Sequence, residues 1–77
     1  MKTHPKIFAD FNNTDKRRCL RLNTRGALED IEKQNIKLKE GLEVLLYDHD
    51  ELETSGVIEF SLEENIWVAR IDWSLIM

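Results

Sequence analysis

Residues 48–53 are the part of this chain whose side chains are best suited to chemistry. Within six residues the sequence places four carboxylates and one imidazole: Asp48, His49, Asp50, Glu51 and Glu53. Carboxylate oxygens are the ligands that calcium prefers, and an imidazole beside carboxylates could bind a transition metal. The stretch could therefore be a metal site, an acid–base site or an acidic turn between two strands.

The spacing of these residues argues against a metal. A calcium loop needs oxygen ligands at alternate positions, a glycine at its sharp turn and a glutamate at the twelfth position. Asp48 and Asp50 fit, but Leu52 takes the third ligand position and no glycine follows, although the twelfth residue is Glu59. A single histidine makes only a weak transition-metal site. We expect no metal and interpret residues 48–53 as a solvated acidic loop that could contact a partner.

A basic stretch, "KRRCLRLNTR" at residues 16–25, is the second candidate site. In a strand Arg17, Cys19 and Arg21 share one face, and an arginine-lined face beside Phe8 could grip a phosphate backbone, because RNA readers combine cations with stacking platforms. The alternative is a solvated face neutralised by nearby acidic residues. The candidate nucleic-acid-binding residues are Arg17, Arg18, Arg21 and Arg25.

Cys19 is the only cysteine, which excludes an internal disulfide and a cysteine-based zinc site and fits a reducing compartment. Basic neighbours could lower its pKa, but a catalytic thiolate also needs a positioned base, and His4 and His49 are the only histidines. No phosphate loop, GxSxG or HExxH motif occurs. We expect a non-enzymatic protein with no catalytic residue and no cofactor.

Charge and length limit the partners. The 77 residues carry a net charge of −4, with seven basic and two acidic residues in 1–25 against four and thirteen in 26–77. Overall acidity repels a polyanion, so we expect the two halves to neutralise each other on folding, within a monomer or across a weak homodimer. No stretch resembles a signal peptide or a membrane span. The sequence therefore predicts one cytoplasmic domain, residues 1–77, without a membrane partner.

The first half of the chain alternates between apolar and polar residues and then changes period. Residues 6–11 and 17–23 read as two strands, which suggests a hairpin or at least two neighbouring strands. Asn23 or Thr24 can then cap a short helix. Its apolar stripe is Ala27, Leu28 and Ile31.

The second half predicts an antiparallel meander of strands at 42–48, 55–62 and 66–73, with Asn65 taking positive φ in the last turn. Alternation places one set of side chains on the inner face: Ile58, Phe60, Leu62, Trp67, Ala69, Ile71 and Trp73. We expect Trp67 in the core, because a small domain needs its large aromatic residues inside. Trp73, close to the chain end, is expected to be partly exposed and to contact a partner.

These elements give a mainly β fold with one short helix, in the order β-β-α-β-β-β. Five short strands bury little in an open flat sheet, so we expect them to curl into a partial barrel. Residues 36–73, through "LKEGLEVLLYD", "GVIEF" and "WVARID", resemble SH3-like small β-barrels of the KOW and Tudor type. This resemblance implies binding of peptides, modified side chains or nucleic acid. The clustered loop aromatics of cage-forming members are absent from the sequence pattern.

The sequence therefore predicts an interaction module with an unknown protein or peptide partner. The expected contact residues are Asp48, His49, Asp50, Glu51, Glu53 and Trp73. The alternative is an RNA- or ribosome-associated protein that binds through its arginine face. A small enzyme or metal-binding protein is the third choice.

Overall fold

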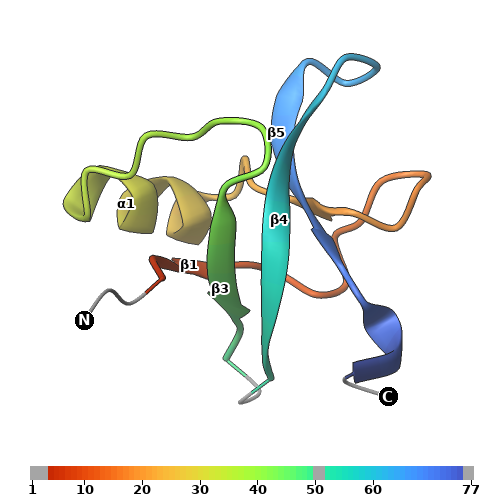
Figure 1. The fold of residues 1–77 in the computed structure, drawn as a ribbon, viewed down its shortest axis with the longest axis horizontal. Helices are drawn as coiled ribbons and strands as arrows, with labels where there is room; N and C mark the ends of the chain where they lie inside the picture. Colours follow the sequence, from red (N-terminus) through yellow and green to blue (C-terminus); the bar gives the residue numbers. More distant parts are fainter. Residues whose placement is uncertain (1–3, 50–51, 76–77) are drawn as a thin grey trace.

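The fold is a five-stranded sheet that curls into a half-barrel, with one helix beside it (Figure 1). The structure is a computed structural model that describes residues 4–49 and 52–75. The predicted mainly β partial barrel and the order β-β-α-β-β-β are confirmed. Its elements are β1 Lys6–Phe8, β2 Leu20–Arg21, α1 Arg25–Lys33, β3 Glu43–Tyr47, β4 Glu53–Ser61, β5 Ile66–Ile71 and the 3₁₀ helix η1 Trp73–Leu75. None of the helices within the described residues is long and apolar enough to cross a membrane.

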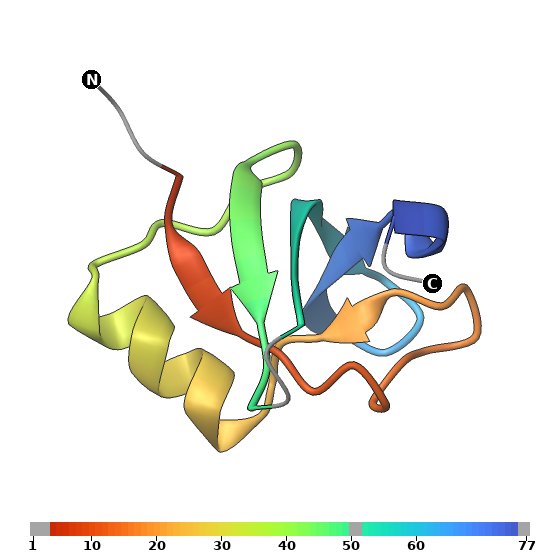
Figure 2. The ribbon, with the colours of Figure 1, turned by 90° about the horizontal axis from the view of Figure 1, so that it is seen from below.

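The sheet order is β1-β3-β4-β5-β2, so the predicted meander of β3, β4 and β5 is confirmed. The turn between β4 and β5 has the predicted backbone conformation, because Asn65 adopts a positive φ of 59°. The hydroxyl of Ser61 accepts the Glu64 amide of the same turn at 3.1 Å. Figure 2 shows the strands along an arc, with the segments that flank β2 crossing its open side.

The expected hairpin of the first two strands is wrong. β1 and β2 lie at opposite edges of the sheet, and β1 pairs in parallel with β3. A parallel pair needs a long crossover, and the chain from β1 to β3 supplies one through β2 and α1. The second strand is also shorter than predicted. The Asp15 carboxylate accepts the amides of Arg17 and Cys19, both at 2.9 Å, and so holds this part of the chain in a turn.

Helix α1 begins at the second of the two predicted cap residues, Thr24, which has an extended backbone and whose hydroxyl accepts the Ala27 amide. Ala27 is buried and Ile31 packs against the core, but Leu28 is 53% exposed, which corrects the predicted stripe. The helix lies along β1 in both ribbon views, at the edge of the sheet (Figures 1 and 2). Only a narrow face of the helix therefore contacts the core.

Asp30 of α1 and Gln34, the C-cap residue that follows the helix, complete the free edge of β1. The Asp30 carboxylate accepts the Phe8 amide at 2.9 Å, and the Gln34 amide donates to the Lys6 carbonyl at 2.7 Å. Asp30 also accepts the Tyr47 hydroxyl at 2.6 Å. An uncovered strand edge is a template for unwanted pairing, so these bonds take the place of a sixth strand.

The opposite edge is covered by the chain itself. Arg21 donates its amide to the Asn13 carbonyl at 3.1 Å, and Asp15 donates to the Cys19 carbonyl at 2.9 Å. A bridge between Thr14 and Leu20 continues this pairing. Both edge strands are thus hydrogen-bonded on their outer sides.

The core fills the inside of the curl. It includes the predicted inner residues of the first strands, together with those of the meander: Ile7, Ala9, Phe11, Leu20, Leu22, Val44, Leu46, Ile58, Ala69 and Ile71. Gly56 also faces inward, where a Cβ atom would lie 2.7 Å from Leu46 Cδ1 and 2.9 Å from Ile71 Cγ2. A larger residue would therefore displace core side chains.

Two predictions at the far end of the core have different outcomes. Trp67 packs against the core and meets Phe60 edge to face, with ring centroids 5.0 Å apart. Leu62 is not on the inner face: it is 89% exposed, whereas Ser61 is 1% exposed. Alternation ends there because β4 stops at Ser61 and Leu62 is already in the turn, where the Ser61 hydroxyl accepts the Glu64 amide.

Candidate interaction surface

The described part of the predicted acidic loop is held by local contacts. The Asp48 amide donates a hydrogen bond to the Leu52 carbonyl at 3.1 Å, and the Leu52 amide donates one to the Asp48 carboxylate at 3.2 Å. The His49 ring lies 4.9 Å from the Phe8 ring, and Glu53 pairs with Lys6 at 3.4 Å.

Asp50 and Glu51 lie outside the described residues. Within the ranges 4–49 and 52–75, no three histidine, cysteine or acidic side chains are grouped closely enough to hold a metal ion.

The four candidate arginines do not share one face. Arg17 is exposed in the turn that follows Asp15, and the Arg18 guanidinium lies 4.9 Å from the centre of the Trp73 ring. Arg25 pairs with Glu29 on the helix at 3.7 Å. The predicted common face of Arg17 and Arg21 required a strand over 17–23, and that strand spans only Leu20–Arg21.

Arg21 forms an ion pair with Glu64 through two hydrogen bonds. Its Nε and Nη2 atoms donate to the two carboxylate oxygens of Glu64 at 2.7 and 2.8 Å, and Nη1 donates to Asn13 at 3.0 Å. The bond to Glu64 raises the pKa of Arg21, and the same bond lowers the pKa of Glu64. This planar two-bond contact fixes the β4–β5 turn against β2.

Cys19 is a packed side chain rather than an activated one. It is 2% exposed. Burial raises the pKa of its thiol, and the charges of Asp15 and Glu59 raise it further, against smaller opposing effects of Arg17 and Arg70. A raised pKa keeps the thiol protonated, which is the opposite of what a nucleophile needs.

Trp73 ties the end of the chain to the turn around Arg18. The predicted strand 66–73 ends at Ile71, because the Asp72 carboxylate accepts the amide and hydroxyl of Ser74 and starts η1. The indole Nε1 donates to the Arg18 carbonyl at 2.8 Å. Its ring meets the Phe11 ring edge to face, with centroids 6.3 Å apart. Trp73 is partly exposed, as expected, but both its polar atom and one side of its ring already have partners.

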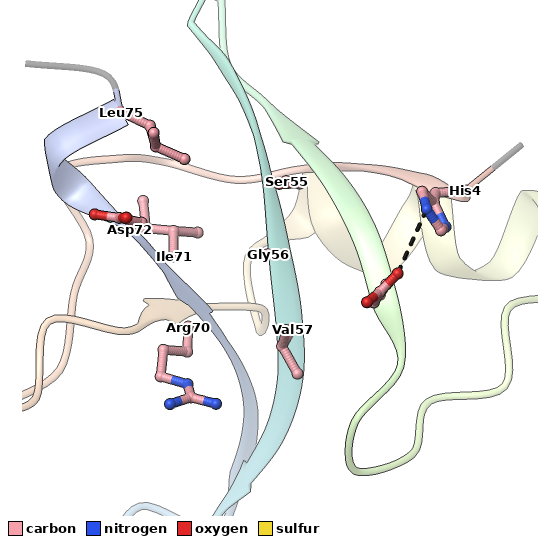
Figure 3. Close-up of a pocket in the computed structure, with 9 residues that line it drawn as sticks. His4, Ser55, Gly56, Val57, Arg70, Ile71, Asp72 and Leu75 are labelled. Carbon is pink, nitrogen blue, oxygen red and sulfur yellow. Dashed lines mark ion pairs between the residues drawn. The ribbon is translucent and has the colours of Figure 1, made fainter.

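An open groove crosses the outer face of the sheet, with a volume of ≈ 610 Å³ (Figure 3). Residues 55–57 of β4 form its floor. One wall carries His4 and Glu43, and the other carries the Arg70 and Asp72 side chains, as the close-up shows. The strand register sets the distance between the two walls, because Glu43 pairs with Val57 across β3 and β4, and Val57 pairs with Arg70 across β4 and β5. For convenience we call this the outer-face groove.

The walls of the outer-face groove carry charged side chains, Glu43 on one side and Arg70 and Asp72 on the other. His4 Nε2 lies 3.6 Å from Glu43 Oε1 on one side, and Arg70 Nε lies 2.9 Å from the Glu59 carboxylate on the other. Hydrogen bonds from Ser74 hold the pKa of Asp72 below its ordinary value, so this carboxylate stays charged. Apolar side chains, Val57, Ile71 and Leu75, between charged walls suit an extended peptide, whose side chains alternate.

The outer-face groove lies between the two contact regions predicted from the sequence. Its floor begins just beyond Glu53, and its far wall includes Asp72, next to Trp73. Sequence reasoning did not single out Glu43, Val57 or Arg70. Alternation places Val57 and Arg70 on the outer face, but only the register shows that these side chains are neighbours.

Comparisons with models of known protein families, with curated proteins and with solved structures found no match. The geometry defines the class: a mainly β half-barrel whose edges are covered and whose outer face carries an open groove with charged walls.

Proposed function

We propose that this protein is a non-enzymatic interaction module whose outer-face groove binds an extended segment of a partner protein. The observation that carries the proposal is the groove itself, in which the apolar side chains Val57, Ile71 and Leu75 lie between walls that carry the charged residues Glu43, Arg70 and Asp72. Charged walls select a partner and fix its direction, while the floor supplies the apolar contact.

The covered edges of the sheet support recognition by side chains. Binding by strand addition needs a free row of amides and carbonyls. The outer sides of β1 and β2 are already bonded to α1 and to residues 13–15. A partner that lies across the outer face meets no such obstacle.

The resemblance of residues 36–73 to SH3-like barrels also supports an interaction module, because that class binds peptides, modified side chains or nucleic acid, although fold alone does not fix a partner. The single cysteine favours a reducing compartment such as the cytoplasm. We expect the module to act as a monomer or a weak homodimer.

RNA binding is the second candidate function. Its proposed surface is the turn at residues 16–18, which is smaller than the arginine face at residues 17–25 predicted from the sequence. Lys16, Arg17 and Arg18 follow one another in a single turn beside Trp73. Within residues 4–49 and 52–75, neither Arg17 nor Arg18 forms an ion pair with a carboxylate. The phosphates of an RNA would contact the positive charges of this turn.

Affinity capture from an extract of the native host tests the proposal. Val57→Arg puts a large charge on the groove floor, whereas Leu28→Arg makes the same kind of change on the exposed side of α1. We expect wild type and Leu28→Arg to retain the same protein, and Val57→Arg to retain about tenfold less of it, while circular dichroism shows all three folded.

Nuclease treatment and added salt separate the two candidates. Retention of a protein partner should survive both, because its contact is partly apolar. Capture of RNA that vanishes at high salt would favour the second candidate. Equal retention by Val57→Arg and wild type would contradict binding through the outer-face groove.

A further inference from the structure

A second groove lies on the other side of His4, between the start of β1, the end of α1 and residues 36–42. It is open and has a volume of ≈ 560 Å³. Apolar surface comes from Pro5, Ile36 and Leu42, and positive charge comes from Lys37 and Lys39. We call this the lysine groove.

The sequence builds the lysine groove by alternation. In "IKLK" at residues 36–39, Ile36 and Leu38 pack against the core, so the two lysines between and after them point away from it. The segment is fixed at both ends. Ile36 donates its amide to the Ile31 carbonyl at 3.0 Å, and the Leu42 carbonyl accepts the Ile58 amide at 2.8 Å. The lysines therefore stand on an anchored stretch of chain.

The positive charge of this groove is uncompensated. Among the residues that the structure describes, no carboxylate lines the groove and neither Lys37 nor Lys39 forms an ion pair. Lys6 and Lys16, by contrast, each lie within 3.6 Å of a glutamate. Two lysines without an ion pair among the described residues, beside partly buried apolar side chains, are a complementary surface for an acidic partner.

We propose that the lysine groove binds an acidic peptide segment of a partner protein, which seats one apolar side chain against Pro5, Ile36 and Leu42 and places carboxylates at Lys37 and Lys39. This site shares only His4 with the outer-face groove and does not depend on the function proposed for that groove. The apolar floor favours a peptide over nucleic acid. No phenylalanine, tyrosine or tryptophan among the described residues lines the groove, so it offers bases no such stacking platform.

Fluorescence anisotropy with defined peptides tests this site. The probe is a labelled eight-residue peptide of glutamates around one central leucine, and the comparators replace that leucine by serine or the glutamates by lysines. A labelled single-stranded RNA of mixed sequence is the third comparator. We expect the glutamate–leucine peptide to bind about tenfold more tightly than each comparator.

A matched pair of double variants separates the groove from general electrostatics. Lys37→Glu/Lys39→Glu and Lys16→Glu/Lys33→Glu change the net charge equally, and all four side chains are exposed. The first pair should weaken binding about tenfold or more, and the second should change it by about twofold or less. Lys37→Gln/Lys39→Gln repeats the loss without reversing the charge, in case the glutamate variant does not fold.

Four results would overturn the proposal. They are equal losses in the two double variants, equal binding of the leucine and serine peptides, tighter binding of RNA than of the peptide, and no binding of the peptide at about 1 mM.

Discussion

The carboxylate of Asp30 links the helix α1 to the strands β1 and β3 through hydrogen bonds. It accepts the Phe8 amide at the edge of β1 and the Tyr47 hydroxyl at the end of β3, while its own backbone belongs to α1. The hydrogen bond to Asp30, with help from burial and from the charge of that carboxylate, raises the pKa of Tyr47 to about 12. Ionisation of Tyr47 would therefore put two negative charges side by side.

The titration of Tyr47 gives a direct prediction, because this is the only tyrosine. Its ionisation, followed by absorbance, should have a midpoint at a pH of about 12 in the folded protein, instead of the ordinary pKa of 10.0. The folded state thus favours the neutral phenol. The stability from this bond is fully present below pH 10.0 and is lost as pH rises through about 12.

Two variants control this titration. Tyr47→Phe should abolish the absorbance change and remove the loss of stability over the same pH window. Asp30→Asn should move the midpoint down toward the ordinary value. A wild-type midpoint near 10.0 in the folded protein would show that the bond to Asp30 does not form.

At the scale of elements, the main contribution of the helix is to hydrogen-bond the edge of the sheet, and its contribution to the core is small. It buries Ala27 and little else, yet Asp30 and Gln34 bond the backbone of β1. Asp30 lies in the helix and Gln34 is its C-cap residue, and both side chains reach the same strand. The helix depends on the sheet for its stability, because an isolated helix of this length is marginal in water.

Removal of one of these bonds should loosen the edge. We expect Asp30→Ala to lower the free energy of unfolding by about 1–3 kcal/mol, because the Phe8 amide and the Tyr47 hydroxyl lose their acceptor. Hydrogen exchange at the Phe8 amide should become faster than in wild type. Glu32→Ala, at an exposed position on the same helix, is the control and should change stability by about 0.5 kcal/mol or less. Equal effects of both variants would contradict the role of Asp30.

The elements also show where sequence reasoning succeeds. The Thr24 cap and the positive φ of Asn65 follow from local chemistry, since a side-chain oxygen or a left-handed backbone satisfies its own neighbours. The hairpin of β1 and β2 fails because alternation defines which face of a strand is buried and says nothing about which strand lies beside it. The short β2 follows from the side chain of Asp15, which competes for the amides that a longer strand would use.

At the scale of the whole molecule, curling decides what is exposed. The inner faces close around one core, and the edges are bonded by α1 with its C-cap residue and by residues 13–15. The surfaces left open among the described residues include the outer face and the groove beside residues 36–42. The partial barrel could be predicted from five short strands in one small chain. The outer-face groove could not, because it depends on the cross-strand register that places Glu43, Val57 and Arg70 in one row.

The opposite charges of the two halves of the chain also meet within the fold. Lys6 with Glu53, Lys16 with Glu63 and Arg21 with Glu64 join basic residues of the first part to acidic residues of the second. This is the neutralisation expected from the sequence, and it leaves Lys37 and Lys39 as part of a distinct basic surface.

Site-specific photo-crosslinking in intact cells of the native host tests the central claim, binding of a partner protein at the outer-face groove, most directly. A photoreactive residue replaces Asp72 on the groove wall or, as the control, Leu28 on the exposed side of α1. We predict a discrete protein adduct from position 72 and none from position 28. Equal adducts from both positions, no adduct from position 72, or an adduct with RNA alone would contradict a protein-binding groove on this face.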